Sequence, residues 1–282
     1  MSYIKKLLVP LTVIIATPTY GDVTVSDEMI AKQRQSLATS TKGQGFGPQS
    51  PRDINLLGGN NPIMFSDAPD HASMNLCNIH FHKNAEHKGG EFTEYAGNGD
   101  GKGFQTGYRY TGKLSAKELR PVKGTICPSS HGALTVGDTI EVHYVHSSAQ
   151  VAPGPTLGAC LNDAIGNPQL RVEAQVYVLV NDRAALDFNK LAEHGLRSNY
   201  HQALNIPSDT GTPIEYAGST TGPSYNEKGS PFQVTWSVRP KVAKVDIKTV
   251  GKWCEGNSFN EDHAHGVRNL VTNSELLAPI KQ

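Results

Sequence analysis

Hydrophobic and polar residues alternate along several short segments of the chain, which is the pattern of β-strands whose two faces meet different surroundings. In residues 139–147, apolar residues at alternate positions are separated by polar ones that include Glu141 and His143. Residues 171–180 place a valine or an alanine at every second position. Less regular strands are expected at 74–82, 232–238 and 242–247. The chain is therefore predicted to be rich in short strands.

Helical periodicity is confined to two short segments, 27–38 and 184–192. The 28 glycines and 17 prolines among 282 residues favour short strands joined by turns over long helices. The sequence contains no internal repeat or long linker, and β-rich domains of this length commonly form one unit. We therefore predict a mainly β fold, a single domain around a central, mostly antiparallel sheet with short peripheral helices.

The first 21 residues are typical of a secretory signal peptide. Lys5 and Lys6 precede the apolar stretch 7–16, which is followed by the small and polar residues 17–21. The apolar stretch is shorter than the about 20 residues that a membrane-spanning helix needs, and an uncleaved anchor is the alternative. Residues 1–21 are expected to be removed, so that residues 22–282 form an exported domain, periplasmic or secreted.

The charge balance argues against nucleic acid and membrane surfaces as partners. Lysine plus arginine and aspartate plus glutamate both total 26, so the chain has no net field that would attract a polyanion or an anionic membrane. A small-molecule substrate is the expected partner, and once the signal peptide is removed no segment is expected to contact a membrane. The sequence carries no signal for an oligomeric state.

Four cysteines, Cys77, Cys127, Cys160 and Cys254, are widely spaced and form no Cys-x-x-Cys pair. In an oxidising compartment an even number of cysteines most often indicates disulfides, here two. Four cysteines allow three pairings, which the sequence leaves open. A zinc-binding thiolate is the competing interpretation, and export argues against it.

Two short segments concentrate histidine. His80 and His82 lie two residues apart in a predicted strand, so their side chains project from the same face. His143 comes from another predicted strand, with Glu141 two residues earlier on its face. Three neutral imidazoles from two strands would form a zinc site with an open fourth position. Glu141 is a candidate to hold the second ring nitrogen of a ligating histidine.

Four segments, in this chain order, resemble the α-class carbonic anhydrases: Gln49-Ser-Pro-Arg-Asp-Ile54, Ile79-His-Phe-His82, Glu141-Val-His-Tyr-Val-His146, and Gly218-Ser-Thr-Thr221 followed by Val234-Thr-Trp236. The string His80-Phe-His-Lys-Asn-Ala-Glu-His-Lys88 is closer still to the δ-class carbonic anhydrases and their exported bacterial relatives. The resemblance implies an α-carbonic-anhydrase-like fold and an enzyme that hydrates CO₂ reversibly to bicarbonate and a proton.

The same resemblance implies roles for individual residues. His80, His82 and His143 would bind Zn²⁺, although His87 could replace one of them. Ligand type alone does not separate zinc from another divalent metal such as cobalt.

Thr220 would be the gatekeeper that orients the attacking hydroxide and donates its own hydroxyl proton to Glu86, and Thr221 would line the substrate pocket. No position matches the α-class proton-shuttle histidine, which leaves His71 and His146 as candidates.

An apolar pocket wall for CO₂ is expected from Val178, Val180 or Trp236. Two other functions compete with this interpretation. The spacing His80-x-His82-x3-Glu86 is that of the first metal-binding segment of a cupin, which would bind iron or manganese. The glycines expected around such a segment are absent. A non-catalytic periplasmic β protein is the other alternative, and the complete set of three histidines weighs against it. A second metal site at His263 and His265 is a weaker possibility, because that segment does not alternate like a strand.

Overall fold

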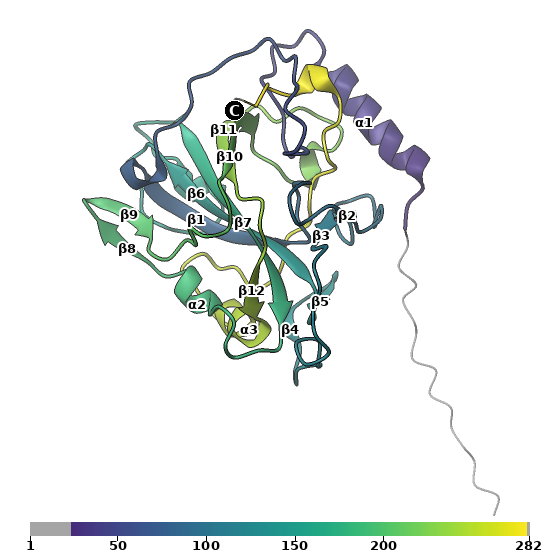
Figure 1. Ribbon diagram of the computed structural model, residues 1–282. Helices are drawn as coiled ribbons and strands as arrows, with labels where there is room; N and C mark the ends of the chain where they lie inside the picture. Colours follow the sequence, from purple (N-terminus) through teal and green to yellow (C-terminus); the bar gives the residue numbers. More distant parts are fainter. Residues whose placement is uncertain (1–23, 281–282) are drawn as a thin grey trace, which may run out of the picture.

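The computed structural model describes residues 24–280, so the predicted signal peptide lies outside the described residues. A central sheet has the strand order β1-β6-β7-β11-β10, with β12 also paired to β7 (Figure 1). Its strands are β1 (Asn75–Lys83), β6 (Thr139–Ser147), β7 (Leu170–Val180), β10 (Ile214–Ser219), β11 (Gln233–Val238) and β12 (Ala243–Asp246). Strand β7 pairs in parallel with β11 and β12, and the other pairings are antiparallel. The predicted mainly β fold and mostly antiparallel sheet are confirmed.

Smaller elements surround the sheet. Three two-stranded sheets are formed by β2 (Glu94–Tyr95) with β3 (Tyr108–Arg109), β4 (Ile126–Ser129) with β5 (Gly132–Leu134), and β8 (His194–Arg197) with β9 (Tyr200–Ala203). The α-helices are α1 (Asp27–Thr41), α2 (Phe188–Leu191) and α3 (Ile247–Cys254), and the 3-10 turns are η1 (His71–Ser73), η2 (Leu157–Cys160), η3 (Pro223–Tyr225) and η4 (Ser274–Leu276). Figure 1 shows α1 on the outside of the molecule, away from the sheet.

One expected helix and one expected strand needed correction. The segment 184–192 contains only the four-residue helix α2, because Asp187 caps a turn that ends at Ala192. The strand expected at 242–247 ends earlier and leads directly into α3. Asp246 accepts a hydrogen bond from the backbone N–H of Lys248 and so starts that helix. None of the helices among residues 24–280 is long and apolar enough to cross a membrane.

The two faces of the sheet bury different groups. On one face Phe81 and Tyr144 pack in an aromatic and aliphatic core with Trp253 of α3. Because neighbouring residues of a strand point to opposite faces, His80 and His143 project to the other face. There Val172 and Trp236 belong to a second buried cluster.

The register of β1 and β6 brings the histidines together. His80 pairs with His143, and His82 pairs with Glu141, across the antiparallel ladder. The ladder is regular through these residues and shifts only between Leu76 and Asn78. The site is thus built on the continuous part of two paired strands.

The four cysteines form two disulfides, as predicted, and the structure selects one of the three pairings. Cys77 is bonded to Cys160, and Cys127 to Cys254, so that no cysteine is free. The first bond ties β1 to η2, and the second ties β4 to the end of α3.

Candidate metal centre

Three imidazoles from β1 and β6 converge at the bottom of a pocket. One ring nitrogen each of His80, His82 and His143 lies within 4.8 Å of the others. Nδ1 of His143 is 3.3 Å from Nε2 of His80. Nε2 of His82 is buried and has no hydrogen-bond partner among the described residues. A buried polar nitrogen without a partner is costly, so this arrangement fits a cation between the three rings.

The opposite nitrogen of each ring meets an oxygen atom. These acceptors are Asn78 Oδ1 at 2.6 Å from His80 Nδ1, the carbonyl of Gly266 at 3.0 Å from His82 Nδ1, and Glu141 Oε1 at 2.9 Å from His143 Nε2. Because an oxygen of this kind accepts the ring N–H, the lone pairs of the three remaining nitrogens point into the site. The tautomer of every ring therefore suits metal binding.

Burial also keeps two of these rings, His80 and His82, neutral. It lowers the pKa of His82 to about 4, against the opposing effect of the Glu86 carboxylate. Burial and the neighbouring His143 lower the pKa of His80 well below its usual value. Metal binding requires the unprotonated imidazole, so His80 and His82 are in the required state at neutral pH.

Glu141 holds His143 through a wider hydrogen-bond network. Its Oε1 also accepts from Nδ1 of His87 at 2.6 Å, and its Oε2 accepts the backbone N–H groups of Glu86 and His87. Burial raises the pKa of Glu141, but the contacts with His87 and His143 prevail and hold it well below the usual range. This carboxylate is therefore ionised at neutral pH.

His87 is occupied elsewhere. Its Nδ1 binds Glu141, and its Nε2 lies 2.7 Å from the hydroxyl of Tyr216. His87, Glu141 and His143 are close enough to hold a metal themselves. Their short contacts are explained by N–H···O hydrogen bonds, because one ring nitrogen of each histidine faces Oε1 of Glu141. The structure therefore gives no reason to exchange a ligand for His87.

The threonine that binds Glu86 is not the expected one. Thr221 Oγ1 donates to Glu86 Oε2 at 2.6 Å, whereas Thr220 Oγ1 pairs with Ser230 Oγ at 2.6 Å. Thr220 still continues the strand pairing, because its N–H binds the carbonyl of Phe232. Successive side chains of an extended chain point to opposite sides, so the next threonine faces Glu86. The expected Thr220–Glu86 hydrogen bond was therefore misplaced by one residue.

The histidines open into a cavity of about 330 Å³. Most of its apolar wall comes from strands and from the turn η2, and this part includes Val145, Leu157, Leu170, Val172, Val234 and Trp236. Trp236 thus occupies the expected place. Val178 and Val180 do not line the cavity. They lie toward the far end of β7, where Val178 pairs with Thr139 rather than with a residue near the histidines.

Comparison with known proteins identifies the family. A model described as Delta carbonic anhydrase matches residues 71–249, which include the three histidines and Thr221. The chain belongs to the δ-class carbonic anhydrase family. It is accordingly an enzyme, a carbonate dehydratase. No curated protein matches the chain.

Solved structures of carbonic anhydrases align with most of this carbonic anhydrase at low identity. They include the α-class enzyme of Thermovibrio ammonificans with sulfanilamide (16% identity, 84% of this chain and 88% of that chain, TM-score 0.28), that of Photobacterium profundum (17%, 87% and 95%, 0.26), and a carbonic anhydrase of Chlamydomonas reinhardtii with acetazolamide (16%, 91% and 96%, 0.31). At such TM-scores the superpositions relate no individual residues.

Neither candidate for a proton shuttle lines the cavity of the carbonic anhydrase. His146 is three residues from His143 on β6 and therefore faces the other side of the sheet. It is buried, its Nδ1 lies 3.0 Å from the carbonyl of Tyr144, and burial lowers its pKa to about 3. His71 stands beside His146, with 5.4 Å between the ring centroids. Their geometry gives no support to a shuttle from this cavity.

The C-terminal segment 265–268 contributes three groups that the sequence reasoning missed. It runs beside β1, with hydrogen bonds between His265 and both Phe81 and Lys83. The His265 ring lines the cavity and binds Glu261 at 2.6 Å. Gly266 supplies the carbonyl on His82, and Arg268 donates its backbone N–H to Glu86 Oε1. Backbone groups occur in every residue and cannot be recognised from residue type. The His-x-His spacing of His263 and His265 was therefore the only feature of the sequence that drew attention to this segment.

Proposed function

We propose that this carbonic anhydrase is zinc-dependent and that His80, His82 and His143 hold the Zn²⁺. The carrying observation is the convergence of three imidazoles, among which Nε2 of His82 is buried without a hydrogen-bond partner. Three neutral nitrogen ligands are the set typical of catalytic zinc, which keeps one coordination position open. Bound zinc would lower the pKa of a water molecule towards neutrality, an established property of carbonic anhydrases.

Thr221 is the residue best arranged to orient the attacking oxygen. Both oxygens of Glu86 already accept hydrogen bonds, one from Thr221 and one from the backbone N–H of Arg268. The Thr221 proton therefore points to Glu86, and the oxygen lone pairs of Thr221 are left to accept from the cavity. A hydroxide that donates its hydrogen to Thr221 would direct its own lone pair toward CO₂.

The apolar wall beside the histidines suits the other reactant. CO₂ is small and carries no net charge, so a surface of Val145, Val172 and Trp236 would bind it without competing for its oxygens. Bicarbonate, the charged product, is better solvated by water and leaves an apolar surface readily. The apolar wall thus favours CO₂ over the product.

We also propose that the enzyme is exported, with residues 1–21 as signal peptide and 22–282 as one catalytic domain. Two disulfides fit an oxidising compartment. The balanced charge fits a small-molecule substrate, and neither nucleic acid nor a membrane surface is needed as a partner.

The cupin alternative requires Glu86 as a ligand. Both Glu86 oxygens are engaged by Thr221 and Arg268, and Glu86 is not among the groups whose atoms converge as a metal cluster. Membership of the carbonic anhydrase family leaves neither the cupin nor the non-catalytic protein with a supporting observation.

The test is CO₂ hydration by stopped flow, with zinc content measured on the same samples. The purified protein should contain about one zinc per chain, and His143→Ala should lose zinc and activity together. His146→Asn is the matched control, because it changes a buried histidine of the same strand on the opposite face. Zinc and activity that survive in His143→Ala would refute the ligand set, and an inactive zinc-loaded wild type would refute the reaction.

A further inference from the structure

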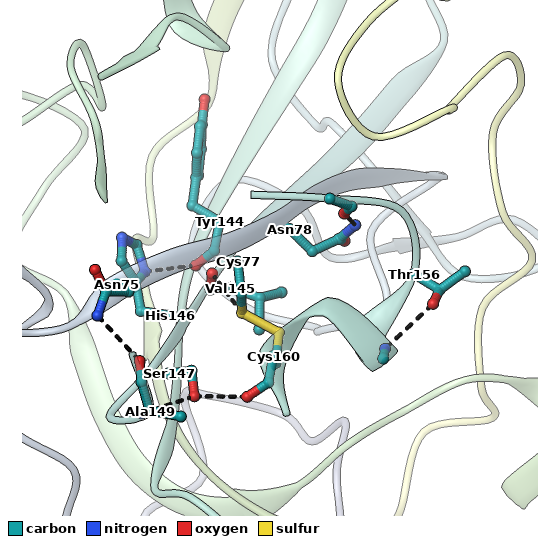
Figure 2. The surroundings of a disulfide bond; sticks show 12 residues. Asn75, Cys77, Asn78, Tyr144, Val145, His146, Ser147, Ala149, Thr156 and Cys160 are labelled. Carbon is teal, nitrogen blue, oxygen red and sulfur yellow. Dashed lines mark hydrogen bonds between the residues drawn. A yellow bond between two sulfur atoms is a disulfide. The ribbon is translucent and has the colours of Figure 1, made fainter. Parts of the chain in front are cut away.

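The loop that follows β6 is tied to β1 beside the metal centre. Cys160, at the end of η2, is bonded to Cys77, the residue of β1 at which the strand register shifts. Figure 2 shows this bond joining the strand to the short turn. Within the same loop, the N–H of Gly154 donates to the carbonyl of Cys77 at 2.9 Å. We call residues 148–160 the tethered loop.

The tethered loop determines which way the Asn78 amide points. Asn78 Nδ2 donates to the carbonyl of Gly154 at 3.0 Å, so its Oδ1 faces Nδ1 of His80 at 2.6 Å. A carbonyl only accepts hydrogen bonds, and an amide nitrogen only donates them. With the NH₂ group fixed on Gly154, the Asn78 oxygen must accept the Nδ1–H of His80.

The opposite amide orientation would disable the ligand. Asn78 would then present its NH₂ to His80, and Nδ1 would need a lone pair to accept from it. The ring proton would move to Nε2, the nitrogen that points into the site. A protonated Nε2 cannot bind a metal. The opposite orientation would also turn the Asn78 oxygen toward the Gly154 carbonyl, so that two acceptors would face each other.

Few other groups hold that carbonyl in place. Pro153 and Pro155 flank Gly154 and have no amide hydrogen, so Gly154 supplies the backbone N–H bond of this stretch to β1. The first end of the tethered loop is fixed by Asn75 of β1, whose amide donates to the carbonyl of Ala149. The second end is fixed by Ser147, whose hydroxyl donates to the carbonyl of Cys160, and by the disulfide. Cys77 and Cys160 are both fully buried. Loss of the covalent bond would let the middle of the loop move away from β1.

We propose that Asn78 is a positioning residue for His80, and that the Cys77–Cys160 disulfide maintains it, so that zinc affinity depends on this disulfide. The inference rests on the proposed function, because it takes His80 as a zinc ligand. Exchange of the two thiols with a disulfide oxidant outside the cytoplasm, which is itself reduced to a dithiol, would then prepare the site for the metal, and the reduced chain would bind zinc weakly.

The second disulfide provides a matched control. Cys77→Ala/Cys160→Ala opens a loop of 83 residues, and Cys127→Ala/Cys254→Ala opens one of 127 residues. By loop-closure entropy the control loses at least as much stability. We expect the zinc dissociation constant, measured by competition with a chromophoric chelator, to rise about 10–100-fold in the first variant and to stay unchanged in the control.

Two substitutions at Asn78 test the route by which the disulfide acts. Asn78→Leu, with both disulfides intact, should weaken zinc binding about as much as loss of the disulfide. Asn78→Asp has no NH₂ group and offers His80 only acceptors, so in the Cys77→Ala/Cys160→Ala background it should restore most of the lost affinity. In zinc-free protein, ¹⁵N shifts of the imidazoles should show His80 as the Nδ1–H tautomer in wild type and a mixture after loss of the disulfide.

Equal weakening in both disulfide variants would overturn the proposal, since general destabilisation would then explain the result. Unchanged affinity in Asn78→Leu would overturn it as well, even if the double-alanine chain fails to fold. Wild-type protein that binds no zinc would refute the proposed function and this inference together. Tight zinc binding by wild type and all variants would refute this inference alone.

Discussion

The adjacent threonines at the end of β10 allow a sharp test of the hydroxyl that orients the reaction. Thr221 donates to Glu86, and Thr220 pairs with Ser230, both at 2.6 Å. Valine has nearly the shape of threonine and lacks only the hydroxyl. Thr221→Val and Thr220→Val therefore remove one hydrogen bond each, from neighbouring positions, with little change in packing.

The two losses differ in size and kind. The side chain of Glu86 is fully buried, so removal of the Thr221 donor leaves a buried carboxylate oxygen unpaired, at a cost of about 1.5–3 kcal/mol in stability. Thr221→Val also removes the acceptor that would orient the nucleophile. Loss of one such preorganised contact typically lowers the rate about 100-fold, or about 2.7 kcal/mol at the transition state. Thr220→Val breaks a hydrogen bond between two neutral hydroxyls, at a cost of about 1 kcal/mol of stability or less. It should lower the rate of CO₂ hydration far less than Thr221→Val does.

The assay is stopped-flow CO₂ hydration, with zinc content and urea unfolding measured for each variant. We expect Thr221→Val to retain zinc and lose kcat/KM, because the three histidines and their acceptors are unchanged. A larger loss of activity in Thr220→Val would refute the reasoning and return the gatekeeper role to that residue. Full activity of zinc-loaded Thr221→Val would also refute it.

Three further predictions concern the metal and the buried histidines. Glu141→Gln should weaken zinc binding at least about 10-fold in chelator competition, since it loosens the hold on His143, and an unchanged dissociation constant would contradict this. Zinc at 1,000 times its dissociation constant should stabilise the protein by about 4 kcal/mol against urea, and a chelator should remove that gain. For His146 the pKa falls from 6.5 unfolded to about 3 folded, so the unfolded state binds the extra proton and stability is lost as pH falls below 6.5. At pH 5 the loss is about 2 kcal/mol, from 1.5 units at 1.36 each. In urea unfolding of zinc-free protein, His146→Asn should gain that amount relative to wild type between pH 7 and pH 5, and an equal difference at both pH values would contradict the shift.

The sequence predicted the strands well where the pattern is local. Alternation in residues 139–147 corresponds to β6, and the run at 171–180 corresponds to β7 within one residue at its start. The same periodicity of two places His80 and His82 on one face. Helix α3 was missed although Ile247, Val250 and Trp253 are its buried residues, at the three-residue spacing of a helix face. The strand predicted at 242–247 overlaps the first residue of α3, so the start of the helix was not recognised.

Long-range features could not be predicted. The pairing of His80 with His143 depends on strand register, and the disulfide pairing depends on the whole chain path. The position at which β10 ends determines which of the two threonines faces Glu86. The sequence alone did not show where that strand ends. Gly266 acts through its carbonyl, which every residue possesses. Residue type therefore indicated the candidate ligands, and the fold was needed to identify what holds them.

The three proposed ligands differ in how much of the fold each requires. His143 is held by Glu141 of its own strand, and that carboxylate is in turn held by the backbone N–H groups of Glu86 and His87, which follow β1. His80 depends on a loop closed by a disulfide, through Asn78. His82 depends on Gly266, which is 184 residues away and is positioned by hydrogen bonds between the C-terminal segment and β1. On the proposed ligand set, a complete zinc site would therefore require the oxidised and fully folded chain.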